Sequence, residues 1–432
     1  MGKFQQLYLN LFSTNSFIRN VIKLMSGTAL GQGLVVVCTP LLTRIYAPKD
    51  FGALTVFMAV TSILSVISCG RYELGIVLPE EDSDGANLLI LSVFFALMTT
   101  ILTTSIVILI NYLSFPVFSG IKKECASWIW YIPISLLVTG VFQALNYWAT
   151  RRKQFGRLAM RQVTQSVTMI LVQIAIGLFI VANEKGLIVG LIAGQIVATG
   201  LMLIQTWKED GQLIFQTCKY TVIKDMVYQY RKFPLYTIWA SLLNSLSPQL
   251  PVFFLSAISL SAAGYFGLAT RVVGLPMSLV GNSVAQVFFA DASEQRNREG
   301  NCSLTFKSTV KRLFLVSLLC MVPVIGVGFF MAPIFGSQWT NAGVVLFMLI
   351  PLFFMRFLSS PVSSIFYISQ RQDLDLVITV LFAFIPVVAF MLSKQQGWTY
   401  LIAILIYSVS MALAYGLQLV LGLKLSVRDL EN

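Results

Sequence analysis

Three arginines stand alone inside long apolar runs of the sequence. Arg71, Arg271 and Arg356 are flanked by hydrophobic stretches, and Arg44 lies at the end of another such run. A charge in an apolar medium costs free energy, so such residues tend to bind a ligand or to pair with a residue of opposite charge. A guanidinium offers a planar fork of donors that matches phosphate oxygens. These residues predict a site for an anionic ligand; structural pairing, or for Arg44 a side chain reaching the headgroup layer, is the alternative.

Glu73 is the only carboxylate well inside one of these runs. It lies two residues from Arg71, and on a helix two such side chains point to nearly opposite sides. We therefore expect no local ion pair between them. Glu73 is a candidate for exchanging a proton or binding sodium, and neutralising an arginine of another helix is the alternative.

Uncharged polar residues gather in two of the apolar runs. Asn244, Gln249, Asn282 and Gln286 could hydrogen-bond the hydroxyls of a sugar. Contact between helices is the competing explanation. The sequence has no histidine, no paired-cysteine metal motif, no P-loop and no nucleophile elbow. We therefore expect no catalytic residues, no metal and no cofactor, and a protein that is not an enzyme.

The elements that position these residues are membrane-spanning helices. Of the 432 residues, 57% are hydrophobic and only 11% are charged, far below the roughly 25% charged residues of soluble domains. The apolar runs are near the roughly 20 residues that a helix needs to cross a bilayer. Twelve spans are predicted, at about 21–43, 51–78, 86–111, 125–149, 160–181, 186–206, 234–257, 263–290, 313–335, 342–369, 374–393 and 398–422.

The distribution of basic residues tests this arrangement. Of the 30 Lys and Arg residues, 21 fall in loops on the side of the termini and 6 on the opposite side, as the positive-inside rule requires. Both termini are therefore predicted to be cytoplasmic. The net charge of +12 is explained by these short loops, so no nucleic acid is expected as a partner.

The spans fall into two groups of six. We predict an N-terminal six-helix lobe at 1–206, a cytoplasmic amphipathic connection at 207–233 and a C-terminal six-helix lobe at 234–432, around a central cavity. The connection has apolar residues at a spacing that suits a helix on the membrane surface. Two six-helix repeats with substrate held between them are a frequent transporter architecture.

Three stretches resemble a known family. Arg71–Pro79, Phe233–Pro251 and Gly264–Phe289 are similar to the second, seventh and eighth spans of bacterial O-antigen or polysaccharide flippases of the Wzx type. That family belongs to the multidrug/oligosaccharidyl-lipid/polysaccharide exporter superfamily. The resemblance extends over essentially the whole chain, and it is the three stretches together, not any one of them, that carry it.

The resemblance implies translocation of an undecaprenyl-diphosphate-linked oligosaccharide from the cytoplasmic to the periplasmic leaflet. It also implies a cationic cavity, coupling to an ion gradient and a place in the bacterial inner membrane. The partners implied are the lipid-linked oligosaccharide, membrane lipids, and a polysaccharide polymerase with its chain-length machinery. A multidrug/cation antiporter of the same fold is the first alternative. A membrane polysaccharide polymerase or ligase is the second, although those enzymes carry a sizeable periplasmic loop.

Overall fold

The computed structural model describes residues 16–112 and 128–427, which fold into helices and short turns. The first half contains α2 (Ser16–Ile45), α3 (Pro48–Ser65), η1 (Tyr72–Val77), α4 (Asp82–Tyr112), α6 (Tyr131–Arg151), α7 (Phe155–Phe179), α8 (Glu184–Thr217) and α9 (Tyr220–Gln229). The second half contains η3 (Phe233–Thr237), α10 (Ile238–Leu246), η4 (Ser247–Gln249), α11 (Leu250–Ile258), α12 (Leu260–Glu299), α13 (Ser303–Phe329), α14 (Met331–Phe335), η5 (Ser337–Trp339), α15 (Thr340–Ser359), η6 (Ser360–Val362), α16 (Ile365–Ile368), α17 (Gln372–Gln395) and α18 (Tyr400–Val427).

The chain divides into two compact units. Unit 1 comprises residues 1–38 and 57–245, and unit 2 comprises residues 39–56 and 246–432. The end of α2 and the beginning of α3 therefore belong to unit 2, while the rest of both helices belongs to unit 1. Each unit is a bundle of helices with its own apolar core.

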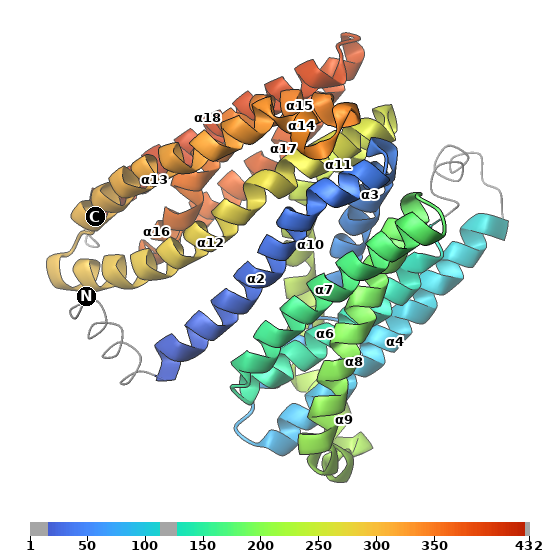
Figure 1. Ribbon diagram of the computed structural model, residues 1–432. Coiled ribbons are helices and arrows are strands. Elements are labelled where there is room, and N and C mark those ends of the chain that lie inside the picture. The colour runs from blue at the N-terminus through green and yellow to red at the C-terminus, as the bar shows by residue number, and fades with distance from the viewer. Residues whose placement is uncertain (1–15, 113–127, 428–432) are drawn as a thin grey trace, which may run out of the picture. The chain divides into compact units, whose positions relative to one another are not determined.

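Unit 1 is built on α4, α6, α7 and α8, which run side by side in Figure 1. Its core surrounds Trp148 on α6, which is fully buried and packs with Leu145, Tyr72, Ile76 and Met202. In unit 2, α12, α13, α15, α17 and α18 pack together, and buried rings from several of them, such as Phe288, Phe306 and Phe357, form the core. Large apolar side chains fill both interiors.

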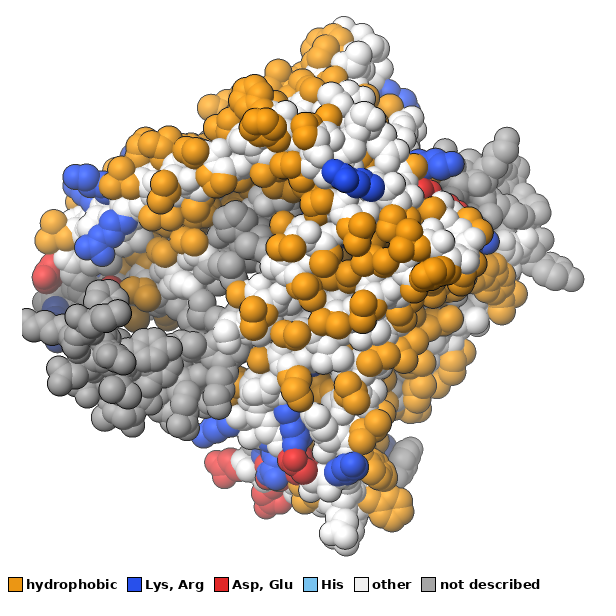
Figure 2. Space-filling model, in the orientation of Figure 1, with side chains coloured by type: hydrophobic (Ala, Val, Ile, Leu, Met, Phe, Trp, Pro, Cys, Tyr) orange, Lys and Arg blue, Asp and Glu red, His pale blue; other side chains and the backbone are white. Residues whose placement is uncertain are grey.

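Ten stretches of helix in the described part of the chain are long and apolar enough to cross a membrane. They are 26–45, 82–111, 131–151, 155–179, 184–217, 233–258, 303–329, 337–368, 372–395 and 400–427. Helices α3 and α12 lie where the second and eighth spans were predicted. Hydrophobic side chains are spread over the whole described face in Figure 2, and on unit 1 the charged ones gather where α7 begins. The predicted all-α membrane fold is confirmed.

The second predicted span is not one helix. A continuous helix was expected over 51–78, but α3 ends at Ser65 and a turn leads to the short helix η1. Gly70 and Arg71 both have left-handed backbone conformations, with φ of 60° and 64°. The turn keeps its backbone hydrogen-bonded through i to i−3 bonds, such as Gly70 N to Ile67 O at 3.0 Å and Tyr72 N to Cys69 O at 3.2 Å. Such bonds satisfy backbone N–H and C=O groups, as an apolar medium requires, although the segment is not a regular helix.

The connection predicted at 207–233 contains the end of α8 and the whole of α9. Met226 is buried, and Val222 and Ile223 pack with it against the core of unit 1. The Tyr72 hydroxyl donates a hydrogen bond of 3.3 Å to the Val227 carbonyl. Protein, rather than lipid, therefore covers this side of α9.

Candidate functional site

Arg71 and Glu73 form an ion pair at the turn between α3 and η1. Arg71 Nη1 lies 3.4 Å from Glu73 Oε1, although the sequence predicted that the two could not pair locally. That prediction was wrong because it assumed a regular helix. The left-handed conformation of Arg71 turns its side chain toward the one two residues later.

This ion pair is enclosed and incompletely hydrogen-bonded. Glu73 is 1% exposed and Arg71 is 18% exposed. Within the described residues, Glu73 Oε2 and Arg71 Nε are buried without a hydrogen-bond partner. The Tyr147 hydroxyl of α6 lies within electrostatic range of both charges. A carboxylate with a buried, unused acceptor oxygen can take up a proton or a small cation.

Three hydrogen bonds hold the turn against α6 and α4. The Cys69 thiol donates to the Gly140 carbonyl at 3.2 Å, and the Ser68 hydroxyl donates to Gln143 Oε1, also at 3.2 Å. The Thr99 hydroxyl of α4 donates to the Ser68 carbonyl at 2.8 Å. Gly140 is required at this contact, because an added Cβ would lie only 2.8 Å from the Ala96 Cβ. Unit 1 thereby fixes the position of the ion pair.

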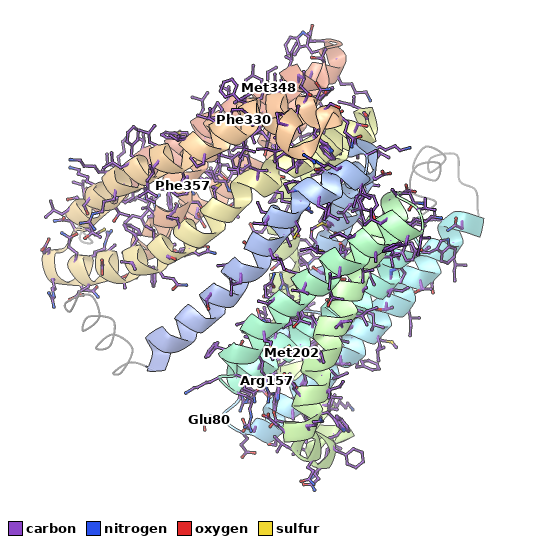
Figure 3. The ribbon with its side chains drawn as sticks, in the orientation of Figure 1. Glu80, Arg157, Met202, Phe330, Met348 and Phe357 are labelled. Carbon is purple, nitrogen blue, oxygen red and sulfur yellow. The ribbon has the colours of Figure 1, made fainter. Side chains whose placement is uncertain are left out.

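A second group of charges lies at the end of unit 1 where α7 begins, here called the Arg151 cluster: Asp82, Arg151, Arg152 and Asp210. Arg151 Nε lies 2.9 Å from Asp82 Oδ1, and Arg152 contacts both Asp82 and Asp210. Arg151 also donates to the carbonyls of residues 76, 79 and 80. Figure 3 shows Glu80 and Arg157 at this same end. The acidic turn before α4 is thus held by arginines, with Asp82 and Asp84 in the first turn of the helix, where the helix dipole favours them.

Arg271 lies in unit 2 with no carboxylate near it in the described residues. Its guanidinium lies over the ring of Phe51, 5.8 Å from the ring centroid. At about 100° per residue, Asn282 lies about 20° and Gln286 about 60° from Arg271 around α12. Asn282 and Gln286 are both exposed. One side of α12 therefore carries a cation followed by two amides over about 22 Å.

The other predicted site residues are separate from this stripe. Arg44 donates a hydrogen bond of 3.1 Å to the Pro333 carbonyl. Arg356 is exposed on α15, within electrostatic range of the Tyr407 and Tyr415 hydroxyls of α18. Asn244, on α10 in unit 1, is also exposed, and Gln249 is partly buried in η4 of unit 2. The structure brings Arg71 and Glu73 into contact, and among the described residues no ion pair joins the other predicted site residues.

Sequence reasoning missed a further, partly buried cation, Arg161. Its guanidinium lies 3.3 Å from the centroid of the Phe142 ring, and within the described residues its Nε makes no hydrogen bond. The predicted span began at 160, which placed Arg161 at the membrane surface. Helix α7 begins at Phe155, so Arg161 lies about 9 Å into it.

The comparison with known proteins identifies the family. A profile of the family described as polysaccharide biosynthesis protein matches residues 41–343, which is more than half of the chain. The chain belongs to this family. Teichuronic acid biosynthesis protein TuaB of Bacillus subtilis (strain 168) is 21% identical to this family member over 278 residues. That match covers 63% of this chain and 56% of TuaB, so it spans little more than half of the relative.

Solved structures share the fold of this family member. The lipid II flippase MurJ in an inward closed conformation has a TM-score of 0.70 at 14% identity, with 94% of this chain and 87% of MurJ covered. An inward-facing multidrug resistance MATE transporter has a TM-score of 0.68 at 14% identity, with 93% of both chains covered. This chain therefore shares the fold of these two transporters, and the resemblance to a polysaccharide-exporting family seen in the sequence is confirmed by the family match.

Proposed function

We propose that this protein is a flippase for an undecaprenyl-diphosphate-linked oligosaccharide. It moves this lipid from the cytoplasmic to the periplasmic leaflet of the bacterial inner membrane, and an ion gradient drives the movement. The observation that carries the proposal is Arg271, a cation on α12 where the eighth span is predicted, which has no acidic partner in the part of the chain described.

The depth of Arg271 along α12 is the reason why a cation without an acidic partner there indicates an anionic ligand. Arg271 lies 11 residues after Leu260, the first residue of α12, or about 16 Å along the helix. That is about half of a hydrocarbon core roughly 30 Å thick. A guanidinium at such a depth needs water or an anion to solvate it. A diphosphate supplies the anion, and Asn282 and Gln286 on the same side of α12 supply hydrogen bonds for sugar hydroxyls.

The relatives support a lipid-linked cargo. TuaB is named for teichuronic acid biosynthesis, and MurJ is named as a lipid II flippase. The family itself is described by polysaccharide biosynthesis. A lipid-linked oligosaccharide is a cargo that agrees with all three names. A polysaccharide polymerase and its chain-length machinery would act on the product in the periplasmic leaflet.

The Arg71–Glu73 pair is the part of this mechanism that we assign to ion coupling. While Glu73 is ionised, it neutralises Arg71, with 3.4 Å between Oε1 and Nη1. A proton or a sodium ion on Glu73 would release the Arg71 guanidinium to bind an anion. Ion binding and binding of the diphosphate would then favour each other, as coupled transport requires.

A multidrug/cation antiporter of the same fold is the competing function. A cationic drug needs a carboxylate that is free to bind it. The buried carboxylates of the described residues are Asp50, Glu73 and Asp210. Asp50 accepts from the Ala47 amide, Glu73 from Arg71, and Asp210 from Trp148 and Arg152. These contacts favour an anionic cargo.

Flipping in proteoliposomes tests the proposal. The probe is an undecaprenyl-diphosphate-linked oligosaccharide with a fluorescent label, and a membrane-impermeant reductant reports how much label reaches the outer leaflet. We expect Arg271→Ala to slow flipping roughly 30-fold, because a hydrogen-bonded charged pair contributes about 2 kcal/mol. Arg271→Lys should recover part of the rate, since lysine keeps the charge but lacks the fork.

The matched control is Arg298→Ala, on the last turn of the same helix. Arg298 is exposed and pairs with Glu294 one turn away, so its loss should leave the rate unchanged. Wild-type rates in the Arg271→Ala protein, at equal protein content, would refute the role of Arg271. Transport of cationic dyes by a wild-type protein that does not move the labelled lipid would instead establish the antiporter function.

A further inference from the structure

An apolar groove lies between α13 and α18 in unit 2. It has a volume of about 430 Å³. Phe306, Val310 and Phe314 line it from one side of α13, and Leu419, Val420 and Leu423 line it from α18. One end of the groove lies about one turn from the start of α13, beside the last turns of α18, which runs back along α13. A hydrocarbon chain fits such a lining.

Two lysines give the groove a positive rim. Lys307 and Lys311 also line it, one turn apart on α13. Both side chains are exposed, and neither makes an ion pair with a described residue. In Figure 2, basic side chains stand out from a mostly hydrophobic surface where α13 begins. The rim is thus complementary to an anionic headgroup.

The length of the groove indicates which lipid it fits. Phe306 and Phe314 are eight residues apart, which corresponds to about 12 Å along the helix. One leaflet of hydrocarbon is about 15 Å deep. The groove therefore matches one acyl chain within one leaflet, while a long polyprenyl chain would extend well beyond it. Single lysine charges, rather than guanidinium forks, suit a monoanionic phosphodiester.

We propose that this groove binds one anionic phospholipid of the leaflet on the side of the chain termini, which the charge distribution predicts to be cytoplasmic. One acyl chain lies between α13 and α18, and the phosphate contacts Lys307 and Lys311. The bound lipid thereby contacts both α13 and α18. Its binding does not depend on the proposed transport function.

Lipid titration of the purified full-length protein in detergent tests this site. Phosphatidylglycerol is titrated against phosphatidylcholine while the midpoint of thermal unfolding is followed, and native mass spectrometry counts the lipids bound. We expect phosphatidylglycerol to raise the midpoint and to remain as one bound molecule. The Lys307→Gln/Lys311→Gln variant should need roughly 30-fold more lipid, since each lysine near an anionic lipid contributes about fivefold.

Two further variants separate the headgroup from the acyl chain. Leu423→Trp fills the groove but keeps both lysines, and it should also weaken phosphatidylglycerol binding. The control Lys208→Gln/Lys224→Gln removes the same charge from exposed positions of unit 1 and should bind like wild type. If Leu423→Trp does not fold, Val310→Trp fills the same groove from α13.

Four results would overturn the proposal. Equal stabilisation by phosphatidylcholine would show nonspecific solvation by lipid. Unchanged binding in the double lysine variant would show that the lysines do not bind the headgroup. Stabilisation by glycerol phosphate alone would show that the acyl chain does not contribute to binding. Displacement of phosphatidylglycerol by a polyprenyl diphosphate at equal concentration would assign the groove to the carrier lipid instead.

Discussion

At the scale of single residues, the arginines of this chain differ in how their charge is compensated. Arg71 has Glu73 beside it, and Arg151 and Arg152 share Asp82. Arg161 and Arg271 have aromatic rings beside them and no carboxylate among the described residues. A ring stabilises a cation only weakly compared with an anion. We therefore predict that Arg271, which has no carboxylate beside it, is the first of these arginines to bind an anionic ligand.

The buried ion pair predicts an asymmetric effect of mutation on stability. Arg71→Ala leaves the buried Glu73 charge without its partner and should lower the free energy of unfolding by about 3 kcal/mol. Arg71→Gln/Glu73→Gln removes both charges and should cost less than half as much. Thermal unfolding of the purified proteins measures both. A double variant less stable than Arg71→Ala would show that the pair itself, rather than the isolated carboxylate, governs stability.

The residue types could be found from the sequence, but their partners could not. Charges inside apolar runs identified Arg71, Arg271, Arg356 and Glu73 directly, because the cost of such a charge depends mainly on its surroundings along the chain. The Arg71–Glu73 contact depends on two backbone torsions. A non-glycine residue with positive φ is uncommon, so nothing in the residue spacing indicated it.

At the scale of elements, hydropathy located the spans and not their ends. The predicted span at 186–206 is the first part of α8, which continues to Thr217. Trp148 and Arg152 hold Asp210 on this extension with hydrogen bonds of 2.9 and 3.0 Å. The helix is therefore stabilised beyond its apolar part by contacts with α6, and those contacts follow from the tertiary structure. The break after Ser65 likewise depends on tertiary contacts, in this case those of the following turn with α6 and α4.

Gly70 should be essential for that break. Its φ of +60° costs an L-residue with a side chain about 1–2 kcal/mol, so Gly70→Ala should lower the free energy of unfolding by about that amount. The control is Gly200→Ala in α8, where an added Cβ meets no atom within 4 Å and helix propensity improves. Thermal unfolding of both variants gives the comparison. A stabilised Gly70→Ala protein would mean that α3 and η1 can join into one helix.

At the scale of the whole molecule, the chain combines two bundles with an uneven distribution of charge. Both units contain segments from the beginning of the chain, because unit 2 takes residues 39–56. Contiguous lobes were the simplest expectation from the order of the spans, and they remain a prediction for the functional molecule. The charge distribution constrains a different property, which is the side of the membrane that each loop faces.

Cysteine labelling tests that orientation. Cys218 is exposed between α8 and α9, near the basic residues Lys208, Lys219 and Lys224, so the positive-inside rule places it in the cytoplasm. Lys394, at the end of α17, is predicted to be periplasmic. In a protein with Cys38, Cys125 and Cys320 replaced by serine, a membrane-impermeant maleimide should label Cys218 in inverted vesicles but not in intact cells. A Lys394→Cys variant that also carries Cys218→Ser should show the opposite pattern.

The two positions lie on opposite sides of the membrane only if the number of spans between them is odd. The predicted spans at 234–257, 263–290, 313–335, 342–369 and 374–393 lie between Cys218 and Lys394, and each corresponds to a helical segment in the structure. Cys69 and Cys302 are fully buried, so they can stay in place without reacting. Labelling of both positions from the same side would show that one of these five segments does not cross. The seventh span, interrupted at η4, and the long α12 would then be the segments to re-examine, and the proposed direction of transport would have to be derived again from the corrected topology.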